Sequence, residues 1–396
     1  MSSINSTTPR TLSRLAEHTP PFHVMALLER AQALQAAGRD VIHLEVGEPD
    51  FPCAEPIMAA AREALDAGAT RYTPAAGLPA LREAIARDYR QRLGAPVQAG
   101  QVVVTPGASG ALQLLMGALL NPGDEVLLCD PGYPCNSQFV TMFGGVPKPL
   151  SLPAEQHFRL SLERLSSAWA ARTRVAMVAS PDNPTGNRMG TQQLAAMARW
   201  CDEQGGVLVV DEIYQGLCYD APADTVLRHD SPALVINSFS KYFGMTGWRL
   251  GWLVAPAEWV PAIERLAQNW FLAPGTVAQH AALAAFSAES LAIAEQRRQW
   301  LERRRALLVE ALPAMGLPVA GGGQGAFYLY LDVSAHTDDS FGFCRDLLEE
   351  TGVAITPGLD FGRHHQPERY ARLAYTCDED RLRDALQRMA SFMERR

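Results

Sequence analysis

The middle of the chain alternates short apolar runs with stretches of helical spacing. From Gln101 to Val254, each apolar run is followed by a turn of small or polar residues and then by an amphipathic segment. This order is typical of β-α-β crossovers, in which the strands lie parallel and are buried on both faces. We therefore predict an α/β fold with a mostly parallel sheet flanked by helices. The predicted strands are 101–105, 125–130, 174–180, 207–211, 234–238 and 250–254.

Both ends of the chain carry a different pattern. A polar arm precedes a helix at 24–37 and a strand at 41–45, and a long charged helix at 288–312 leads into a mixed segment. We expect this long helix to connect two domains. The remaining predictions are helices at 55–67, 78–93, 340–351 and 378–396, strands at 326–331, 353–356 and 369–375, and a flexible turn at 321–325.

The length and composition allow two domains. A chain of 396 residues, of which 47% are hydrophobic, can bury a sizeable core. We predict that residues 1–46 form an arm and part of a small α+β domain, which residues 288–396 complete. Residues 47–287 are expected to form the large ligand-binding domain.

Charge and hydropathy argue against two kinds of partner. The net charge of −8 and the pI near 5.6 leave no basic surplus for a nucleic-acid backbone. The longest apolar runs, such as 111–120, are too short to cross a bilayer, and the polar N-terminus lacks the apolar core of a secretory signal. We expect a cytoplasmic protein without nucleic-acid or membrane partners.

Cysteine and histidine spacing argues against a metal. The seven cysteines form an odd set without C-x-x-C spacing, so we expect reduced thiols. The nine histidines show no H-E-x-x-H pattern, and no metal site is predicted. The adjacent His364 and His365 are expected in a solvated loop.

Candidate chemistry centres on the stretch 237–251. Lys241 stands in an otherwise uncharged run, and Arg249 follows eight residues later. A lysine amine attacks a carbonyl only when it is unprotonated, and burial beside a second cation lowers its pKa. The hydroxyls of Ser238 and Ser240 and the Arg249 guanidinium are donors suited to a phosphate. A strand end with an exposed lysine is the structural alternative.

Other polar residues fall at the carboxyl ends of the predicted strands, where ligands of parallel sheets bind. The segment 107–111 opens a helix, so its amides and the Ser109 hydroxyl suit a phosphate, unless its small residues only permit a tight turn. Asp211 ends an apolar strand, where a buried carboxylate needs a cation such as a protonated pyridine nitrogen. A helix N-cap is the alternative role for Asp211.

Three further residues carry weaker signals. Tyr214 could donate to a phenolic oxygen on the ring that carries the protonated pyridine nitrogen, although packing tyrosines are about as common. Asn183 in Ser-Pro-Asp-Asn-Pro-Thr-Gly is a turn former that lies at a strand end. Tyr133 in Pro-Gly-Tyr-Pro could stack on a flat cofactor or could only occupy a turn.

The joint order of these motifs resembles the class I/II aminotransferases, the fold-type I enzymes that use pyridoxal 5′-phosphate. The resemblance runs from Val41 through the C-terminal helices, and it implies a seven-stranded, mostly parallel sheet. Its most specific motifs are Ser-Pro-Asp-Asn-Pro-Thr-Gly at 180–186, Asp-Glu-Ile-Tyr at 211–214, and Ser-Phe-Ser-Lys with Gly-Trp-Arg-Leu-Gly at 238–251. Gly-Glu-Pro-Asp-Phe at 47–51 and Arg-Tyr-Thr-Pro at 71–74 are also similar to the family.

The resemblance implies a role for each motif residue. The implied catalytic residues are Lys241, which would form the Schiff base and move the proton, Asp211, which would pair with the ring nitrogen, and Tyr214. Tyr214 and Asn183 would bond the 3-oxygen of the ring, on which Tyr133 would stack. The phosphate would be held by Ala108, Ser109, Ser238, Ser240 and Arg249, with Tyr72 reaching in from the other subunit of a homodimer. The substrate α-carboxylate would be bound by Arg372, Asn183 and the backbone at Gly47, although Arg372 taken alone would be a surface residue of a strand.

The implied reaction is a ping-pong transamination between an L-amino acid and a 2-oxo acid. One branch of the family uses a lysine in the phosphate loop to bind a distal carboxylate, whereas Ala108 and Ser109 stand in that loop here. The segment 269–272, which in relatives borders the neighbouring active site, is bulky and apolar. Both departures favour a neutral or hydrophobic amino donor over aspartate.

Of three rival functions, the residues leave the first open and argue against the other two. A C–S β-lyase, racemase or decarboxylase of fold-type I would use the same residues and the same cofactor. A regulator that senses the cofactor would need an added DNA-binding domain, for which the stretch before Val41 has no room. A dinucleotide-dependent oxidoreductase is disfavoured because no G-x-G-x-x-G follows the first strand.

Overall fold

A seven-stranded sheet forms the centre of the protein. The structure is a computed structural model that describes residues 12–395, so the first part of the predicted arm lies outside it. The strand order is β2-β8-β7-β6-β5-β3-β4, and all strands are parallel except β8, which runs antiparallel to both neighbours. The predicted fold class is thereby confirmed. The strands are β2 (Val102–Thr105), β3 (Glu125–Asp130), β4 (Val146–Ser151), β5 (Thr173–Ala179), β6 (Val207–Asp211), β7 (Leu234–Ser238) and β8 (Gly251–Val254).

One strand of this sheet, β4, was not predicted from the hydrophobic pattern. The sequence of β4, Val-Pro-Lys-Pro-Leu-Ser, contains two prolines, which cannot donate to a strand ladder. β4 lies at the edge of the sheet beside β3, where missing donors are tolerated. The resemblance, and not the periodicity, supplied the seventh strand.

Alternate residues of each strand face opposite layers of helices. In β2, Val103 packs in the cluster that includes α5 and α9, whereas Val102 and Val104 pack in the cluster that includes α4, α8 and α10. Burial on both faces explains why the strands are continuous apolar runs. We call the sheet and its helices the large lobe. These helices are α3 (Glu55–Asp66), α4 (Pro79–Gln91), α5 (Gly107–Leu119), α6 (Cys135–Met142), α7 (Leu162–Ala168), α8 (Thr191–Glu203), α9 (Val260–Trp270) and α10 (Thr276–Leu283).

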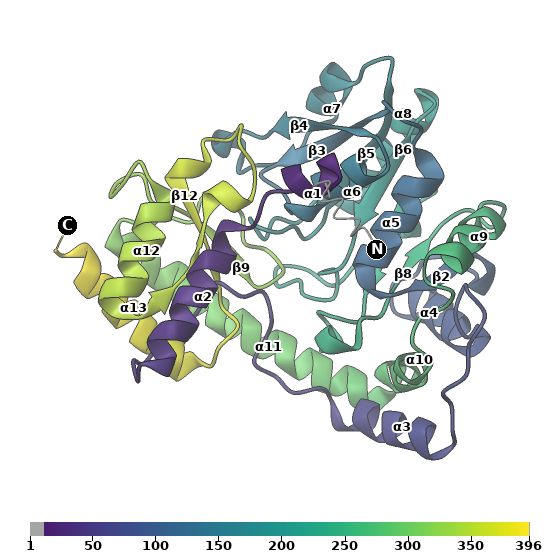
Figure 1. The fold of residues 1–396 in the computed structure, drawn as a ribbon, viewed down its shortest axis with the longest axis horizontal. Helices are drawn as coiled ribbons and strands as arrows, with labels where there is room; N and C mark the ends of the chain where they lie inside the picture. The colour runs from purple at the N-terminus through teal and green to yellow at the C-terminus, as the bar shows by residue number, and fades with distance from the viewer. Residues whose placement is uncertain (1–11, 396) are drawn as a thin grey trace, which may run out of the picture.

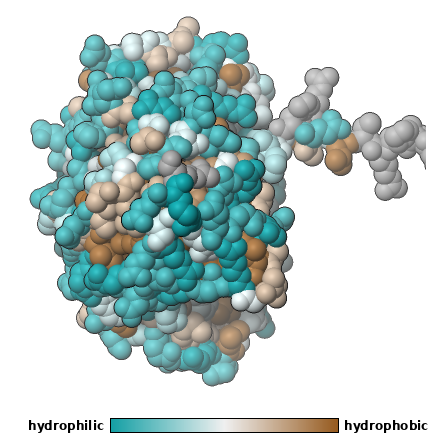
Figure 2. Space-filling view, turned by 90° about the vertical axis from the view of Figure 1, so that its left-hand side faces the viewer, coloured by the Kyte–Doolittle hydropathy of each residue, from teal (hydrophilic) through white to brown (hydrophobic). Residues whose placement is uncertain are grey.

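A small lobe is built from both ends of the chain, and Figure 1 shows the purple helix at 23–36 beside the yellow-green helix at 340–351. β1 pairs with β10, and β11, β12 and β9 form a separate sheet, so the predicted strand at 353–356 is divided at Ile355. The outward face of this lobe is mostly hydrophilic (Figure 2). Its elements are α2 (His23–Ala36), β1 (Ile42–His43), β9 (Tyr328–Asp332), α12 (Ser340–Thr351), β10 (Val353–Ala354), β11 (Thr356–Pro357), β12 (Tyr370–Ala374) and α13 (Glu379–Met393), preceded by the short α1 (Arg14–His18).

The long helix α11 (Ala288–Ala311) joins the two lobes, as Figure 1 shows along the bottom of the view. Leu291 packs against the large-lobe cluster, whereas Leu301 and Leu308 belong to the small-lobe cluster. No single helix of the described residues is long and apolar enough to cross a bilayer. The segments 276–286 and 288–315 reach that length and composition only as a pair bent by 79°.

One loop prediction was wrong. His365 is buried, with 6% of its surface exposed, and only its neighbour His364 is exposed. The burial is tolerated because both ring nitrogens of His365 have partners, the Asp130 carboxylate and the Tyr330 hydroxyl. Asp130 lies 235 positions away in the sequence, so no local pattern could report this contact.

Candidate active site

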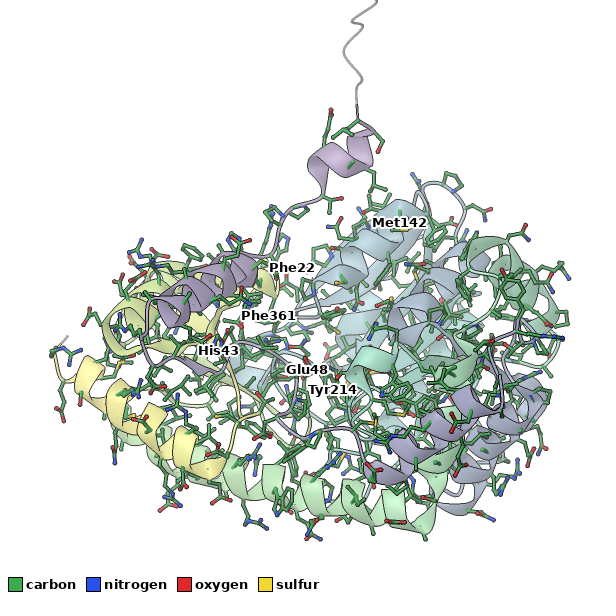
Figure 3. All side chains as sticks on the ribbon, turned by 60° about the horizontal axis from the view of Figure 1, so that its bottom comes forward. Phe22, His43, Glu48, Met142, Tyr214 and Phe361 are labelled. Atoms are coloured by element: carbon green, nitrogen blue, oxygen red, sulfur yellow. The ribbon has the colours of Figure 1, made fainter. Side chains whose placement is uncertain are left out.

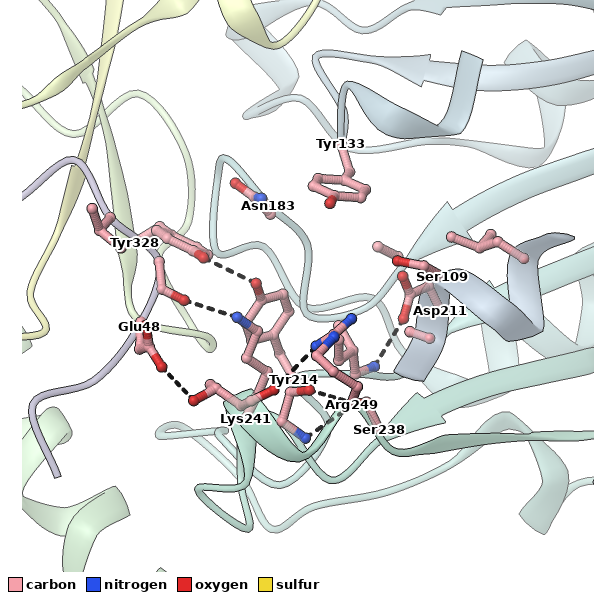
Figure 4. A pocket seen from close by; sticks show the side chains of 18 of the residues that line it. Glu48, Ser109, Tyr133, Asn183, Asp211, Tyr214, Ser238, Lys241, Arg249 and Tyr328 are labelled. Carbon is pink, nitrogen blue, oxygen red and sulfur yellow. Dashed lines mark hydrogen bonds between the residues drawn. The ribbon is translucent and has the colours of Figure 1, made fainter. Parts of the chain in front are cut away.

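A cavity of about 490 Å³ lies where β5, β6 and β7 end and the small lobe begins. Small-molecule sites commonly enclose roughly 300–1,000 Å³. Figure 3 shows Glu48 and Tyr214 at the junction of the lobes, and Figure 4 shows side chains of both lobes pointing into this space. The cavity is lined by the predicted site residues Gly47, Ala108, Ser109, Tyr133, Asn183, Asp211, Tyr214, Ser238, Ser240, Lys241, Arg249 and Arg372.

Tyr72 is the one predicted site residue outside the lining of this cavity. Its side chain is 85% exposed. A role for Tyr72 in such a site requires a second copy of the chain, so that role stays a prediction.

One end of the cavity is a cradle of donors at the start of α5. The first amides of a helix have no partner within the helix, and its dipole favours an anion there. The Arg249 guanidinium lies over this end, because a Cβ at Gly107 would be 2.7 Å from its Nη2. Gly251 lets β8 approach the start of α5 equally closely, since a Cβ at position 251 would be 2.8 Å from the Ala108 nitrogen. The glycines of these motifs therefore serve close packing around an anion site.

Two buried serines complete the cradle. The Ser238 hydroxyl lies 2.9 Å from the Ser240 hydroxyl and 3.0 Å from the Leu250 carbonyl, and it can donate to either. The Ser238 oxygen also accepts the Ser240 amide at 3.0 Å. When Ser238 donates to Ser240, the Ser240 hydroxyl keeps its own proton for a ligand.

The carboxylate of Asp211 lines the cavity at the end of β6. Its Oδ1 accepts the backbone N–H of Ile213 at 3.0 Å, and it forms no ion pair within residues 12–395. Burial raises the pKa of Asp211 to about 6, although the Ile213 amide and the Lys241 charge oppose the rise. Binding of a cation beside the two carboxylate oxygens of Asp211 would be strongly favoured.

The Lys241 amine is held between the two lobes. Its Nζ donates to the Gly47 carbonyl at 2.8 Å and lies 5.5 Å from the Phe327 ring centroid. Burial, followed by the charge of Arg372, lowers the pKa of Lys241 to about 8, although Glu48 opposes the shift. About a tenth of this amine is therefore unprotonated at pH 7, far more than for an ordinary lysine.

A pair of tyrosines forms the wall beside Lys241. The hydroxyls of Tyr214 and Tyr328 lie 3.0 Å apart, and the two rings meet edge to face with centroids 5.6 Å apart. Burial raises the pKa of Tyr214 well above its usual value, so this residue stays a neutral hydroxyl. Tyr328 also restricts position 47 to glycine, because a Cβ at Gly47 would overlap the Tyr328 hydroxyl.

Arg372 is clamped between two aromatic rings. Its guanidinium carbon lies 4.3 Å from the Tyr328 centroid and 4.9 Å from that of Phe361. Nη1 donates to the Asn183 side-chain oxygen at 2.9 Å and Nη2 to the Glu45 carbonyl at 2.6 Å, but Nε has no partner within the described residues. Arg372 also lines the cavity, and a guanidinium in that position is suited to a carboxylate ligand.

Some lining residues were missed by the sequence reasoning. The Thr246 hydroxyl donates to Glu48, and Tyr328 lies on β9, which was predicted as a strand at 326–331 without a site role. The glycine run at 321–325 packs closely behind the Asn183 loop, because a Cβ at Gly325 would overlap Pro181. The Gly-Glu-Pro-Asp-Phe motif was the available signal for Glu48.

The cavity fits pyridoxal phosphate. The donors around α5 and Arg249 suit a phosphate, the unpaired Asp211 carboxylate suits a protonated ring nitrogen, and the Lys241 amine suits an aldehyde. Arg372 then leaves a second anion site for a substrate. An α/β protein with a mostly parallel sheet and these groups at its strand ends belongs to the class of pyridoxal-phosphate enzymes.

Comparison with known proteins agrees with this class. The family described as "Aminotransferase class I and II" matches residues 39–389. A valine–pyruvate aminotransferase of Mycobacterium tuberculosis is 37% identical over 94% of this chain and 96% of its own length. An aspartate/prephenate aminotransferase of Thermus thermophilus is 38% identical over 98% of this chain and all of its own length.

Solved structures show the same likeness. A crystal structure of an aminotransferase from Mycobacterium tuberculosis matches with a TM-score of 0.93 at 36% identity, over 98% of this chain and all of that one. A Thermus thermophilus aspartate aminotransferase with maleate matches with a TM-score of 0.90 at 37% identity, over 96% of this chain and 99% of that one. The chain belongs to the class I and II aminotransferases. It is a transaminase that uses pyridoxal phosphate.

Proposed function

We propose that the protein moves an amino group between a neutral or hydrophobic L-amino acid and a 2-oxo acid, with Lys241 as the cofactor attachment site and the proton carrier. The observation that carries the proposal is the Lys241 amine, which lines the cavity between the cradle at α5 and the guanidinium of Arg372. With a pKa of about 8, this amine can give up and regain a proton near neutral pH.

The chain's own groups would hold the cofactor in one orientation. Pyridoxal phosphate, when bound, supplies the electron sink for breaking the bond between the α-carbon of the amino acid and its hydrogen. Asp211 would keep the proton on the ring nitrogen, since a charged partner offsets the burial of its carboxylate. The other proposed contacts are Tyr133 with the ring face, Asn183 and Tyr214 with the 3-oxygen, and Ala108, Ser109, Ser238, Ser240 and Arg249 with the phosphate.

The substrate would be oriented from the opposite wall. Arg372 would bind the α-carboxylate, and Asn183 and the backbone at Gly47 would border the same position. Lys241 Nζ would take the proton from the substrate α-carbon and pass it to the cofactor, and it would carry a proton in the opposite direction when the second substrate runs the reaction in reverse. Because one site serves both half-reactions, ping-pong kinetics are expected.

A neutral side chain is favoured by the charges of the cavity. The cations of its described lining are Lys241, Arg249 and Arg372, and each has a proposed partner. None is left for a distal carboxylate, and Glu48 adds a negative charge beside Lys241. The phosphate loop contributes Ala108 and Ser109 in place of a cation.

The names of the relatives point in both directions. The Mycobacterium tuberculosis relative is named for valine, a neutral donor, whereas the Thermus thermophilus relative is named for aspartate, and their identities to this chain are 37% and 38%. The choice of donor therefore depends on the charges of the cavity lining, and these favour a neutral donor.

A panel of amino acids tests the reaction and its specificity. The holoenzyme is mixed with valine, leucine, methionine, phenylalanine or aspartate without an acceptor, and cofactor absorbance is followed as the pyridoxal form becomes pyridoxamine. We expect the best neutral donor to react at least about tenfold more efficiently than aspartate, because the described lining leaves no cation for a second carboxylate. A strong preference for aspartate would overturn the specificity, and release of pyruvate and ammonia would indicate a lyase.

Trapping with borohydride tests the attachment site. The chain has only two lysines, Lys148 and Lys241, so Lys148 on the edge strand β4 is an internal control. We expect a pyridoxyl label on the peptide of Lys241 alone, and a loss of turnover of about 1,000-fold or more in Lys241→Ala but not in Lys148→Ala. Ordinary turnover in Lys241→Ala would contradict the mechanism.

The proposal includes the arrangement of the chain. We propose a small domain made of residues 1–46 and 288–396, a large domain at 47–287, and a homodimer in which Tyr72 contacts the phosphate of the neighbouring site. The support for the last point is the 85% exposure of a tyrosine within a motif of the family.

A further inference from the structure

A buried contact joins the two lobes behind the cavity. Asp130 ends β3 and is 4% exposed, and three donors from one small-lobe loop converge on its carboxylate. They are the backbone amides of Arg363 at 2.9 Å and His364 at 3.1 Å, and the ring Nδ1 of His365. Gly362 is required in this loop, since it has φ +152° and a Cβ there would overlap the Asp130 carboxylate.

The imidazole of His365 connects Asp130 to the small-lobe sheet. Its Nε2 lies 2.7 Å from the Tyr330 hydroxyl. Burial by itself would raise the pKa of Asp130, but the bonds from His365 and the two amides outweigh it and hold that pKa below its usual value. The charged carboxylate favours a proton on Nδ1, and Nε2 shares the second hydrogen bond of the ring with the Tyr330 hydroxyl.

Both ends of this chain of bonds lead to the cavity. Tyr330 is the direct cross-strand partner of Arg372, so their side chains lie on the same face of the small-lobe sheet. The Phe361 carbonyl accepts the Gly132 amide at 2.8 Å, and the Phe361 ring lies 4.9 Å from the Arg372 guanidinium. Figure 3 shows Phe361 at the junction of the lobes. On the large-lobe side, the next residue after Gly132 is Tyr133, which lines the cavity.

We propose that Asp130, His365 and Tyr330 form a positioning relay. This relay fixes Arg372 relative to Tyr133 on the opposite lobe and thereby sets the affinity for the substrate carboxylate. The inference rests on the proposed function, in which Arg372 binds that carboxylate. The relay residues touch neither substrate nor cofactor, so loosening them should weaken carboxylate binding without slowing the chemistry at Lys241.

The test compares three substitutions in the holoenzyme. Tyr330→Phe removes one hydroxyl from the relay, and His365→Gln removes the ring that spans Asp130 and Tyr330. Tyr370→Phe is the matched control, because its ring stacks on Tyr330 at 5.1 Å and on His365 at 5.9 Å, while its hydroxyl has no hydrogen-bond partner among residues 12–395. The probes are the Kd of 3-methylbutanoate, read from cofactor absorbance, and the split between KM and kcat for the best donor.

The expected pattern separates positioning from general loosening. We expect Kd and KM to rise about threefold to tenfold in Tyr330→Phe and about tenfold or more in His365→Gln, with kcat and the affinity for pyridoxal phosphate changed by less than about threefold. The control should change none of these quantities. Melting temperatures show which variants are folded, and if His365→Gln is not, Tyr330→Phe alone decides.

Two results would overturn the relay. One is an unchanged Kd in the folded relay variants, and the other is an equal rise in Tyr370→Phe, which would indicate loosened packing. A fourth variant, Arg372→Lys, separates this failure from that of the proposed function. If Arg372→Lys loses 3-methylbutanoate binding while the relay variants keep it, only the relay is wrong; if Arg372→Lys keeps it, the role of Arg372 is wrong.

Discussion

At the residue scale, burial moves the pKa values of Asp211 and Lys241, which both line the cavity, in opposite directions. It raises the pKa of Asp211 to about 6 and lowers that of Lys241 to about 8. In both cases the charged form is disfavoured by the loss of water, and nearby charges modify the effect. The carboxylate is thus prepared for a cationic ring, and the amine for attack on an aldehyde.

The first prediction concerns the pH dependence of cofactor capture. The reactive form of Lys241 is unprotonated, so the rate at which the apoenzyme combines with pyridoxal phosphate should rise with pH, with a midpoint near pH 8. Because Arg372 contributes to the low pKa, Arg372→Gln should move this rise to higher pH. Stopped-flow absorbance measures the rate, and a wild-type midpoint near 10 would contradict the assignment.

The second prediction concerns the stability of the apoenzyme. The pKa of Asp211 is raised from 3.8 to about 6, so the folded state binds more protons between these values, and stability falls as pH rises through this window. The cost is fully present above about pH 6, at up to roughly 3 kcal/mol. Asp211→Asn should therefore stabilise the apoenzyme at pH 8 by about 1–3 kcal/mol and abolish turnover.

Urea unfolding at pH 8 and pH 4 measures this stability. The gain should disappear at pH 4, where Asp211 is protonated in the folded wild-type protein. Asp338→Asn, which neutralises an exposed carboxylate, is the control and should change little. An apoenzyme destabilised at pH 8 by Asp211→Asn would show that its carboxylate has a partner the proposal leaves out.

At the scale of elements, the site depends on how closely strands and helices approach one another. β8 passes the start of α5 at Gly251, and Gly107 makes room for Arg249 with φ +71°. The spacing of Gly-Trp-Arg-Leu-Gly places the arginine and the close approach on the same turn. The phosphate cradle is therefore a property of a crossing between two elements.

The third prediction tests this crossing. In Gly251→Ala, the new Cβ would lie 2.7 Å from the Gly107 carbonyl carbon, so either β8 or α5 must shift. We expect a loss of stability of about 2–3 kcal/mol and at least a tenfold weaker affinity for pyridoxal phosphate. Gly100→Ala is the control, because a Cβ at Gly100 meets nothing within 4 Å. Chemical denaturation and cofactor titration provide the two readouts, and an unchanged cofactor affinity would disprove the role of the crossing.

At the scale of the whole molecule, the cavity exists only because the lobes meet. Arg372 and Asn183 are 189 positions apart, and Lys241 and Gly47 are 194 apart, yet each pair is hydrogen-bonded. Arg304 of α11 adds a further connection, with Nη1 and Nη2 on the Asp50 carboxylate at 2.9 and 3.1 Å. The loop that carries Gly47 is thereby fixed to the helix that joins both lobes.

The fourth prediction tests the proposed homodimer by complementation. Lys241→Ala and Tyr72→Ala are each expected to impair their own homodimers. If Tyr72 serves the neighbouring site, a hybrid dimer contains one intact site, so an equal mixture that exchanges subunits should recover roughly a quarter of wild-type activity. Activity is assayed after unfolding and refolding the two variants together. No recovery from confirmed hybrid dimers would show that Tyr72 does not act across the interface.

Much of the fold and site followed from local signals. Burial on both faces makes each central strand a continuous apolar run, and a parallel sheet brings the strand ends to one edge. For this reason the sequence predicts that Asp211, Ser238 and Asn183 lie close together. The edge strand β4 was lost because prolines broke the apolar pattern, and His365 was misplaced because its partners are remote in sequence.

The sequence by itself determined the α/β architecture and the chemical types at the strand ends, because periodicity and turn residues act over a few positions. Only the tertiary structure decided which groups meet: Tyr328 against Arg372, and His365 against Asp130. It also decided the protonation of Lys241 and Asp211, since desolvation depends on what the rest of the chain places around a group. Such contacts join residues that are far apart in the sequence, and no local pattern encodes them.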